Sequence, residues 1–287
     1  MTTTPSLAHT REELADALQS SSAERRRVGL VPTMGALHEG HASLIRTARK
    51  HLGDGPVVVS IFVNPMQFAP GEDLDRYPRS LEADLDMCAV EGVDVVFAPS
   101  LDQVYPAGEP QVSVDPGPMA RVLDGVSRPT HFHGVLTVVA KLFGLVRPYL
   151  AVFGEKDYQQ LALIRRMSSD LSMGVEVVGA PTVREADGLA LSSRNAYLDA
   201  DARQAATALS RSLFAAQAAA LGGPDTALTA ARAVLRGTSG VDLDYLELTA
   251  PDLGAPPDRG EARLLVAARV GGTRLIDNVA LHLGGDS

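Results

Sequence analysis

The sequence has little of what a disulfide-bonded, metal-clustering or nucleic-acid-coating protein needs. Its 287 residues include one cysteine, Cys88, so the chain forms no internal disulfide and no cysteine-rich zinc site. Acidic residues outnumber basic ones by 35 to 26, giving a net charge of −9, whereas a protein that coats nucleic acid needs a basic face. We expect no nucleic-acid partner, a reducing cytoplasmic location, and a buried Cys88.

Long apolar runs and several standard catalytic loops are also missing. The most apolar segment, residues 134–146, is about 13 residues long and contains Lys141, whereas a bilayer crossing needs about 20. The first residues lack the basic and apolar parts of a secretion signal, so we expect a soluble protein with no membrane partner. No Walker lysine loop, no Gly-x-Gly-x-x-Gly after a strand and no Gly-x-Ser-x-Gly occurs, which disfavours P-loop hydrolysis, dinucleotide redox chemistry and serine hydrolysis.

What is present is an alternation of short branched-residue runs with helix-like stretches. Runs that are apolar on both faces are typical of buried parallel strands, and they occur at residues 28–31, 57–63, 93–98, 149–153 and 175–178. Helices are expected between them, at residues 41–51, 80–91, 135–146 and 157–171. This order predicts a doubly wound parallel α/β sheet, whose strand-to-helix loops lie along one edge and converge on one ligand cleft.

The chain changes character near residue 180. Alanine-rich helical segments at residues 200–221 and 225–235 are followed by strand-like stretches at 243–248, 263–270 and 274–283. Helices followed by strands favour a smaller α+β domain. We therefore expect two domains, residues 1–180 and residues 181–287.

Two histidines stand in the polar segment after the first of these strands. His38 and His41 are three apart, so at a helix start they project to the same side. Zinc binding is one interpretation, although the metalloprotease pattern has histidines four apart and no third ligand is nearby. Phosphate binding is another, since Gly35 and Gly40 permit close backbone approach and amides at a helix start favour anions. The third interpretation is that His38 and His41 are ordinary surface residues or helix-capping residues.

Three other segments carry polar groups suited to a substrate. Lys156 begins a predicted helix, where a cation is unfavourable unless an anion such as a polyphosphate binds beside it, and Asp157 can bind a ribose hydroxyl or cap the helix. Ser192-Ser193-Arg194 offers hydroxyls and a guanidinium to phosphate oxygens and can close like a lid, or it is a solvated loop with a cap. Asn64 and Gln67 are neutral amides that can orient hydroxyls and carboxylates.

These segments together resemble a known family. His38-Glu39-Gly40-His41 is similar to the His-x-Gly-His signature of the nucleotidyltransferase superfamily, and Leu191-Ser192-Ser193-Arg194 resembles its Lys-Met-Ser-Lys-Ser-like element. The longer motifs at residues 32–41, 62–68, 153–160 and 184–195 look like those of the pantoate–β-alanine ligases. Leu191 stands where methionine is usual and Asp124 where glutamate is common. The resemblance runs from about residue 10 to residue 283.

The resemblance implies a Rossmann-like nucleotide- and pantoate-binding domain followed by a lid domain. It implies condensation of (R)-pantoate with β-alanine through a pantoyl adenylate, giving pantothenate, AMP and pyrophosphate from ATP. Magnesium as cofactor and a homodimer are implied as well. The implied catalytic residues are His38, His41, Lys156 and Arg194. The implied ATP-binding residues are Met34, Gly35, Ala36, Leu37, His38, Glu39, Gly40, His41, Gly154, Glu155, Lys156, Asp157, Val183, Leu191, Ser192, Ser193 and Arg194. Pantoate is assigned to Gln67 and Gln160, β-alanine to Gln67 and Asn64, and magnesium to Asp84.

Two other functions fit the same phosphate-suited segments. A nucleotidyltransferase would transfer AMP or CMP to a phosphorylated acceptor without forming an amide. A non-enzymatic ATP-sensing module would bind the nucleotide without turnover. A tRNA synthetase is disfavoured because no basic or anticodon-reading region is evident.

Overall fold

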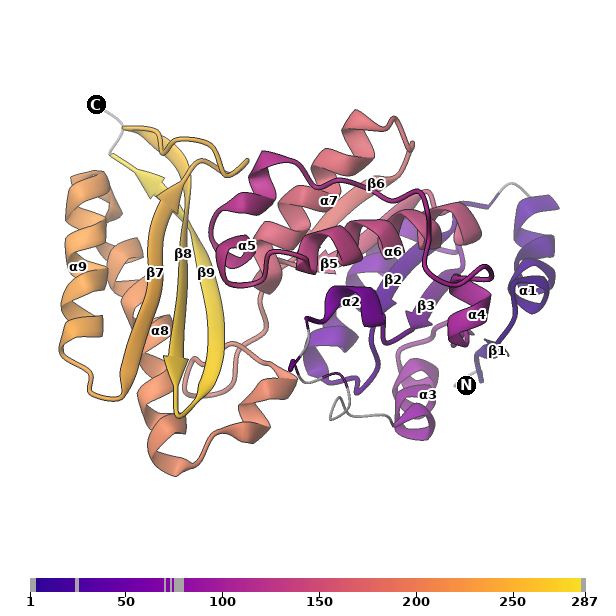
Figure 1. Ribbon diagram of the computed structural model, residues 1–287, viewed down its shortest axis with the longest axis horizontal. Coiled ribbons are helices and arrows are strands. Elements are labelled where there is room, and N and C mark those ends of the chain that lie inside the picture. Colours follow the sequence, from indigo (N-terminus) through magenta and orange to yellow (C-terminus); the bar gives the residue numbers. More distant parts are fainter. Residues whose placement is uncertain (1–3, 24–25, 70, 73, 75–79, 285–287) are drawn as a thin grey trace. The chain divides into compact units, whose positions relative to one another are not determined.

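The computed structural model describes residues 4–23, 26–69, 71–72, 74 and 80–284 (Figure 1). The chain forms two compact units. The first unit comprises residues 1–154 and 163–180, and the second comprises residues 155–162 and 181–287.

The first unit is built on a six-stranded parallel sheet, which confirms the predicted doubly wound α/β architecture. The strands lie in the order β1 (Ser6–Ala8), β4 (Val95–Phe97), β3 (Val57–Ile61), β2 (Gly29–Thr33), β5 (Leu150–Gly154) and β6 (Glu176–Ala180). From β2 the chain adds strands on one side, and from β5 it adds β6 on the other. The order reverses between β2 and β5, and ligands of open parallel sheets bind beyond the carboxyl ends of the strands at such a point.

Helices connect these strands and cover the sheet. They are α1 (Arg11–Ala23), α2 (Glu39–Leu52), α3 (Leu81–Val90), α4 (Leu101–Val104), α5 (Asp124–Ser127), α6 (His131–Val146) and α7 (Tyr158–Asp170), with 3-10 turns that include η1 (Pro65–Gln67) and η3 (Pro118–Arg121). The turn η4 (Glu155–Asp157) and the first residues of α7 belong to the second unit. Ile45 and Ala48 of α2 and Cys88 of α3 pack in one cluster with Val57 and Val59, which alternate along β3. Burial raises the pKa of the Cys88 thiol to about 12, and the nearby Asp84 carboxylate adds to this. Cys88 is therefore a packing residue, as predicted.

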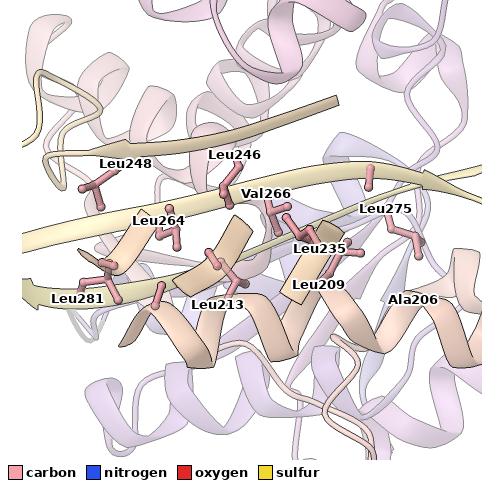
Figure 2. Close-up of a cluster of buried hydrophobic side chains, with 14 of the residues drawn as sticks. Ala206, Leu209, Leu213, Leu235, Leu246, Leu248, Leu264, Val266, Leu275 and Leu281 are labelled. Carbon is pink, nitrogen blue, oxygen red and sulfur yellow. The ribbon is translucent and has the colours of Figure 1, made fainter. Parts of the chain in front are cut away.

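The second unit is a three-stranded antiparallel sheet with two helices on it. Its elements are η5 (Ser193–Tyr197), α8 (Ala200–Ala219), η6 (Ala220–Gly222), α9 (Pro224–Arg236), β7 (Val241–Thr249), β8 (Gly260–Val270) and β9 (Thr273–Leu283), with the strands in that order across the sheet. Figure 2 shows Leu209 and Leu213 of α8, Leu235 of α9 and Leu264 of β8 meeting in its core. This confirms the smaller α+β region.

The bounds of the two units agree only in part with the predicted domains. The first unit ends at Ala180, but residues 155–162, which we expected in the first domain, belong to the second unit. The domain assignment 1–180 and 181–287 therefore stays a prediction. Within the described residues, no helix combines the length and hydropathy that a bilayer crossing requires.

Candidate functional site

The loop after β2 is shaped around one buried carboxylate. Gly35 and Ala36 have φ values of 85° and 51°, so the loop turns sharply and its next amides point the same way. The Ala36 amide donates to Asp84 Oδ2 at 3.0 Å, and the Leu37 amide donates to Asp84 Oδ1 at 2.7 Å. Asp84 comes from α3 and is only 2% exposed. A Cβ on Gly35 would stand 3.0 Å from Asp84 Oδ2, which favours glycine there.

His38 and His41 form a reciprocal capping box at the start of α2. Nδ1 of His38 accepts the Gly40 amide at 3.1 Å, and Nδ1 of His41 accepts the His38 amide at 3.2 Å. The ring centroids are 4.2 Å apart. Because each Nδ1 accepts a hydrogen bond, we assign the proton of each neutral imidazole to Nε2. The structure confirms that both histidines cap the start of α2 through Nδ1.

Four main-chain amides of this loop donate hydrogen bonds within the protein. The amides of Ala36 and Leu37 bind Asp84, and those of His38 and Gly40 bind the two imidazoles. The Glu39 carboxylate pairs with Arg46 at 2.6 Å. The hydrogen bonds of these amides therefore hold the loop in its turn around Asp84 and the two imidazoles.

The turn after β3 lies beside this loop. Gln67 Nε2 is 2.8 Å from Met34 Sδ, which links η1 to the loop after β2. Asn64 Oδ1 accepts the Tyr105 hydroxyl at 2.9 Å, and its Nδ2 donates to the Gly134 carbonyl at 3.1 Å. Asn64 and Gln67 are 1% and 8% exposed, so the structure brings together two predicted substrate segments with their amides oriented.

Sequence reasoning missed the residues that hold this turn. Tyr105 is buried, and burial raises the pKa of its hydroxyl to about 12, so it remains a hydrogen-bond donor. Gly134 of α6 lies so close to η1 that a Cβ would be 2.2 Å from the Met66 carbonyl oxygen. No local motif marks either residue. A tyrosine shortly after a strand and a glycine inside an apolar helix were the available signals.

An ion pair also supports this turn. The Gln67 carbonyl accepts from Arg128 at 3.3 Å and lies 2.9 Å from His131 Nδ1. Arg128 also pairs with Glu72 at 2.6 Å, and its hydrogen bonds hold the pKa of the Glu72 carboxyl below the usual 4.5. The orientation of Gln67 thus depends on residues from both sides of the turn.

In the second unit, Lys156 lies in η4, which is fastened to β8 and β9. Asn278 Nδ2 donates to the carbonyls of Glu155 and Lys156 at 2.8 and 2.9 Å. The Glu155 carboxylate pairs with Arg263 at 2.7 Å. Lys156 Nζ lies 3.6 Å from Asp157 Oδ1. Glu155 therefore supports the turn, while Lys156 and the half-exposed Asp157 side chain remain its ligand-facing candidates, and Gln160 follows them on α7.

The Ser-Ser-Arg segment follows a short hairpin of the same unit. Residues 184 and 190 form an antiparallel bridge, and the Leu191 amide donates to the Val183 carbonyl at 2.9 Å. Ser192 then caps η5, accepting the Arg194 amide at 3.3 Å. The cap expected ahead of Ala200 is supplied by Asp199, which accepts the Ala202 amide. Leu191 therefore lies in a defined turn that leads directly to Ser192.

The geometry does not favour Asp84 as a magnesium ligand. Both of its oxygens accept loop amides, Ser80 Oγ lies 3.3 Å from Oδ1, and its exposure is 2%. Among the residues that the structure describes, no three His, Cys, Asp or Glu side chains are grouped to hold a metal ion. Asp84 shapes the histidine loop in this arrangement.

Comparison with known proteins points to one family. Residues 6–280 match the family described as Pantoate-beta-alanine ligase. A pantothenate synthetase of Nocardioides sp. is 65% identical over 292 residues, covering 99% of this chain and 87% of the relative. One from Mycolicibacterium smegmatis is 59% identical over 259 residues, covering 90% and 82%.

Solved structures agree with this similarity. The crystal structure of pantothenate synthetase from Thermus thermophilus is 47% identical, with a TM-score of 0.88 and coverage of 96% of this chain and 98% of that one. Pantoate-beta-alanine ligase from Francisella tularensis, complexed with beta-gamma ATP and beta-alanine, is 34% identical, with a TM-score of 0.78 and coverage of 96% and 97%.

Proposed function

The chain belongs to the pantoate–β-alanine ligase family, and from that membership we propose how its residues carry out the reaction. It is an ATP-dependent ligase that condenses (R)-pantoate with β-alanine through a pantoyl adenylate. The products are pantothenate, AMP and pyrophosphate. The observation that carries this conclusion is a family match over residues 6–280, which includes every candidate site residue named above.

The adenylate solves a chemical problem. A carboxylate is a poor acyl donor because its leaving group would be oxide. A pantoate carboxylate oxygen attacks the α-phosphorus of ATP, so one P–O bond forms and the bond to pyrophosphate breaks. The β-alanine amine then attacks the activated carbonyl, forming the C–N bond and releasing AMP. Both steps need in-line placement and charge neutralisation more than a protein nucleophile.

We propose that the charged and imidazole groups act on the phosphates. His38 and His41 donate from Nε2, because their Nδ1 atoms are occupied by the capping box. Lys156 and Arg194 neutralise charge, and Ser192 and Ser193 donate hydroxyl hydrogen bonds. The remaining proposed ATP contacts are Met34, Gly35, Ala36, Leu37, Glu39, Gly40, Gly154, Glu155, Asp157, Val183 and Leu191.

The amide side chains are proposed to bind the two other substrates. Gln67 and Gln160 bind pantoate, and Gln67 and Asn64 lie beside β-alanine. The support is that Asn64 and Gln67 are buried at the carboxyl edge of the sheet, with Asn64 oriented by the Tyr105 hydroxyl. Neutral amides can fix a hydroxyl or a carboxylate without adding charge.

Magnesium, a homodimer and a cytoplasmic location are further proposals drawn from the family. Mg²⁺ bound with ATP would neutralise triphosphate charge, and its ligands would be mostly phosphate and water oxygens. Asp84 does not fit as a direct ligand here, since its oxygens accept the loop amides. No step is therefore assigned to a protein-bound metal.

An end-point assay that omits ATP, pantoate or β-alanine in turn tests the function. We expect AMP and labelled amide to form only when all three are present. AMP formation that is independent of β-alanine would favour a nucleotidyltransferase, and ATP binding without turnover would favour a sensing module.

A proton-transfer role for His41 is tested separately. Protonation of its Nδ1 would break the bond from the His38 amide, so any proton must move through Nε2. We expect His41→Gln to lower kcat and to remove one limb of the pH–rate profile. Full activity with an unchanged profile would reject this role.

A further inference from the structure

Two adjacent polar residues lie buried in the C-terminal strand β9. Asp277 and Asn278 are each 3% exposed. Burying a carboxylate and an amide is unfavourable unless both are well hydrogen-bonded. Their hydrogen bonds run to two segments that are distant in the sequence, and each of those segments carries residues assigned to the phosphates of ATP.

Asn278 holds the main chain of the Lys156 turn. Its Nδ2 donates to the Glu155 carbonyl at 2.8 Å and to the Lys156 carbonyl at 2.9 Å. Because both partners are carbonyl oxygens, only the NH2 end of the amide can face them, which fixes the orientation of the side chain. Both of its N–H donors are spent on this one turn.

Asp277 holds the hairpin that precedes Ser192. Its two oxygens accept from Arg184 at 2.6 and 2.9 Å, the bidentate geometry that Arg favours with a carboxylate. Arg184 also donates to the Gly188 carbonyl at 3.1 Å, so the guanidinium closes its own hairpin while it is tied to β9. Asp277 Oδ1 also accepts the backbone N–H of Asn278 at 2.7 Å. This hydrogen bond couples the side chain of Asp277 to the main chain of Asn278.

We propose that Asn278 is a positioning residue for ATP. It holds the Lys156 main chain against β9 while its neighbour Asp277 holds the segment that leads to Ser192–Arg194. One dipeptide thus sets the geometry of two phosphate-binding segments. The inference rests on the proposed function, and it assigns Asn278 an effect on ATP that runs through Lys156.

Three substitutions of Asn278 vary the number of hydrogen-bond donors that the side chain offers. Asn278→Ser keeps one hydroxyl donor, Asn278→Ala keeps none, and Asn278→Asp keeps the shape but sets a carboxylate against two carbonyls. Gln217→Ala is the matched control, because Gln217 also donates an amide hydrogen to β9, at the Ala280 carbonyl (3.0 Å), but from an exposed position.

The readouts are kcat/KM for ATP, the KM values for pantoate and β-alanine at saturating ATP, and the melting temperature. Displacing a charged group by about 1 Å costs up to about a hundredfold, so we expect kcat/KM for ATP to fall about tenfold to a hundredfold in Asn278→Ala and Asn278→Asp. Asn278→Ser should lie between these and the wild type. The other KM values and the Gln217→Ala control should stay within about twofold.

Several outcomes would overturn the positioning role. They are a kcat/KM for ATP within about twofold of wild type, an equal loss for all three substrates, or loss of folded protein in all three variants while the control folds. The last two would show a general structural role. Failure of the wild-type protein to form AMP in a β-alanine-dependent way would instead reject the proposed function, so the two failures are distinguishable.

Discussion

Replacing Asp84 with asparagine separates two roles for this buried carboxylate. As the anchor of the histidine loop, it accepts the amides of Ala36 and Leu37 at 3.0 and 2.7 Å. As a magnesium ligand, it would instead contribute mainly negative charge to an ion. Asparagine keeps the volume and one acceptor oxygen, but it turns an NH2 group toward a backbone N–H that has lost its acceptor.

The magnitude follows from these contacts. A hydrogen bond to a charged group contributes about 1.5–3 kcal/mol, and a buried donor left without its acceptor costs about 1–3 kcal/mol. One of the two amide bonds is lost and the other is weakened, so we expect a loss of about 2–4 kcal/mol in the free energy of unfolding. For a unit of this size the melting temperature should fall on the order of 10 °C.

Thermal unfolding followed by circular dichroism measures the first effect, and activity against Mg²⁺ concentration measures the second. We expect a lower melting temperature, a lower kcat/KM for ATP and an unchanged half-activating Mg²⁺ concentration. Asp86→Asn, at an exposed position of the same helix, is the control and should be near neutral. Wild-type stability together with activity restored by high Mg²⁺ would refute the anchoring role and support the metal-ligand prediction.

Three further predictions concern the turn that carries the amide pair. Gly134→Ala puts a Cβ 2.2 Å from a backbone oxygen of η1, so kcat/KM for pantoate should fall about tenfold or more. Gly144→Ala is the control, because a Cβ at that position of the same helix meets no atom within 4 Å. An equal loss in the control would show that the close approach of Gly134 to η1 is not the cause. Tyr105→Phe removes the hydroxyl that orients Asn64 at 2.9 Å, so steady-state kinetics should show KM for β-alanine rising up to about tenfold with kcat/KM for ATP retained. Glu72 has its pKa lowered from 4.5 by its arginine partner, so its contribution to stability is complete above about pH 4.5 and is lost as the pH falls through the lowered value. Denaturant unfolding of wild type and Glu72→Gln should therefore converge in acid, and a gap that persists there would count against the ion pair.

Most of the fold could be predicted because each buried parallel strand appears in the sequence as a short run of apolar residues. The five predicted strands of the first unit all appear as β2 to β6, within a few residues of their expected bounds. β1 was not predicted, because it has three residues of which two are exposed, so no apolar run marks it. The four-residue helices α4 and α5 were missed for a similar reason, since one turn shows no helical period.

The candidate site was predicted in its residues and less well in its interactions. The pairing of His38 with His41 followed from their spacing, and the structure confirms that they lie together. The hydrogen bonds of the Ala36 and Leu37 amides could not be predicted, because their acceptor is a carboxylate that comes from α3. No residue in or near the loop indicates that Asp84 will bind its amides.

Hydrophobic periodicity and short motifs extend over a few residues, so the class of fold and the chemical groups that follow each strand could be predicted before the structure was known. Which atom each group binds depends on how distant segments pack. Asp84 meets amides 47 and 48 positions away, and Asn278 meets the Lys156 carbonyl 122 positions away. A hydrogen bond depends on distance and angle in space, and these arise only when the chain has packed.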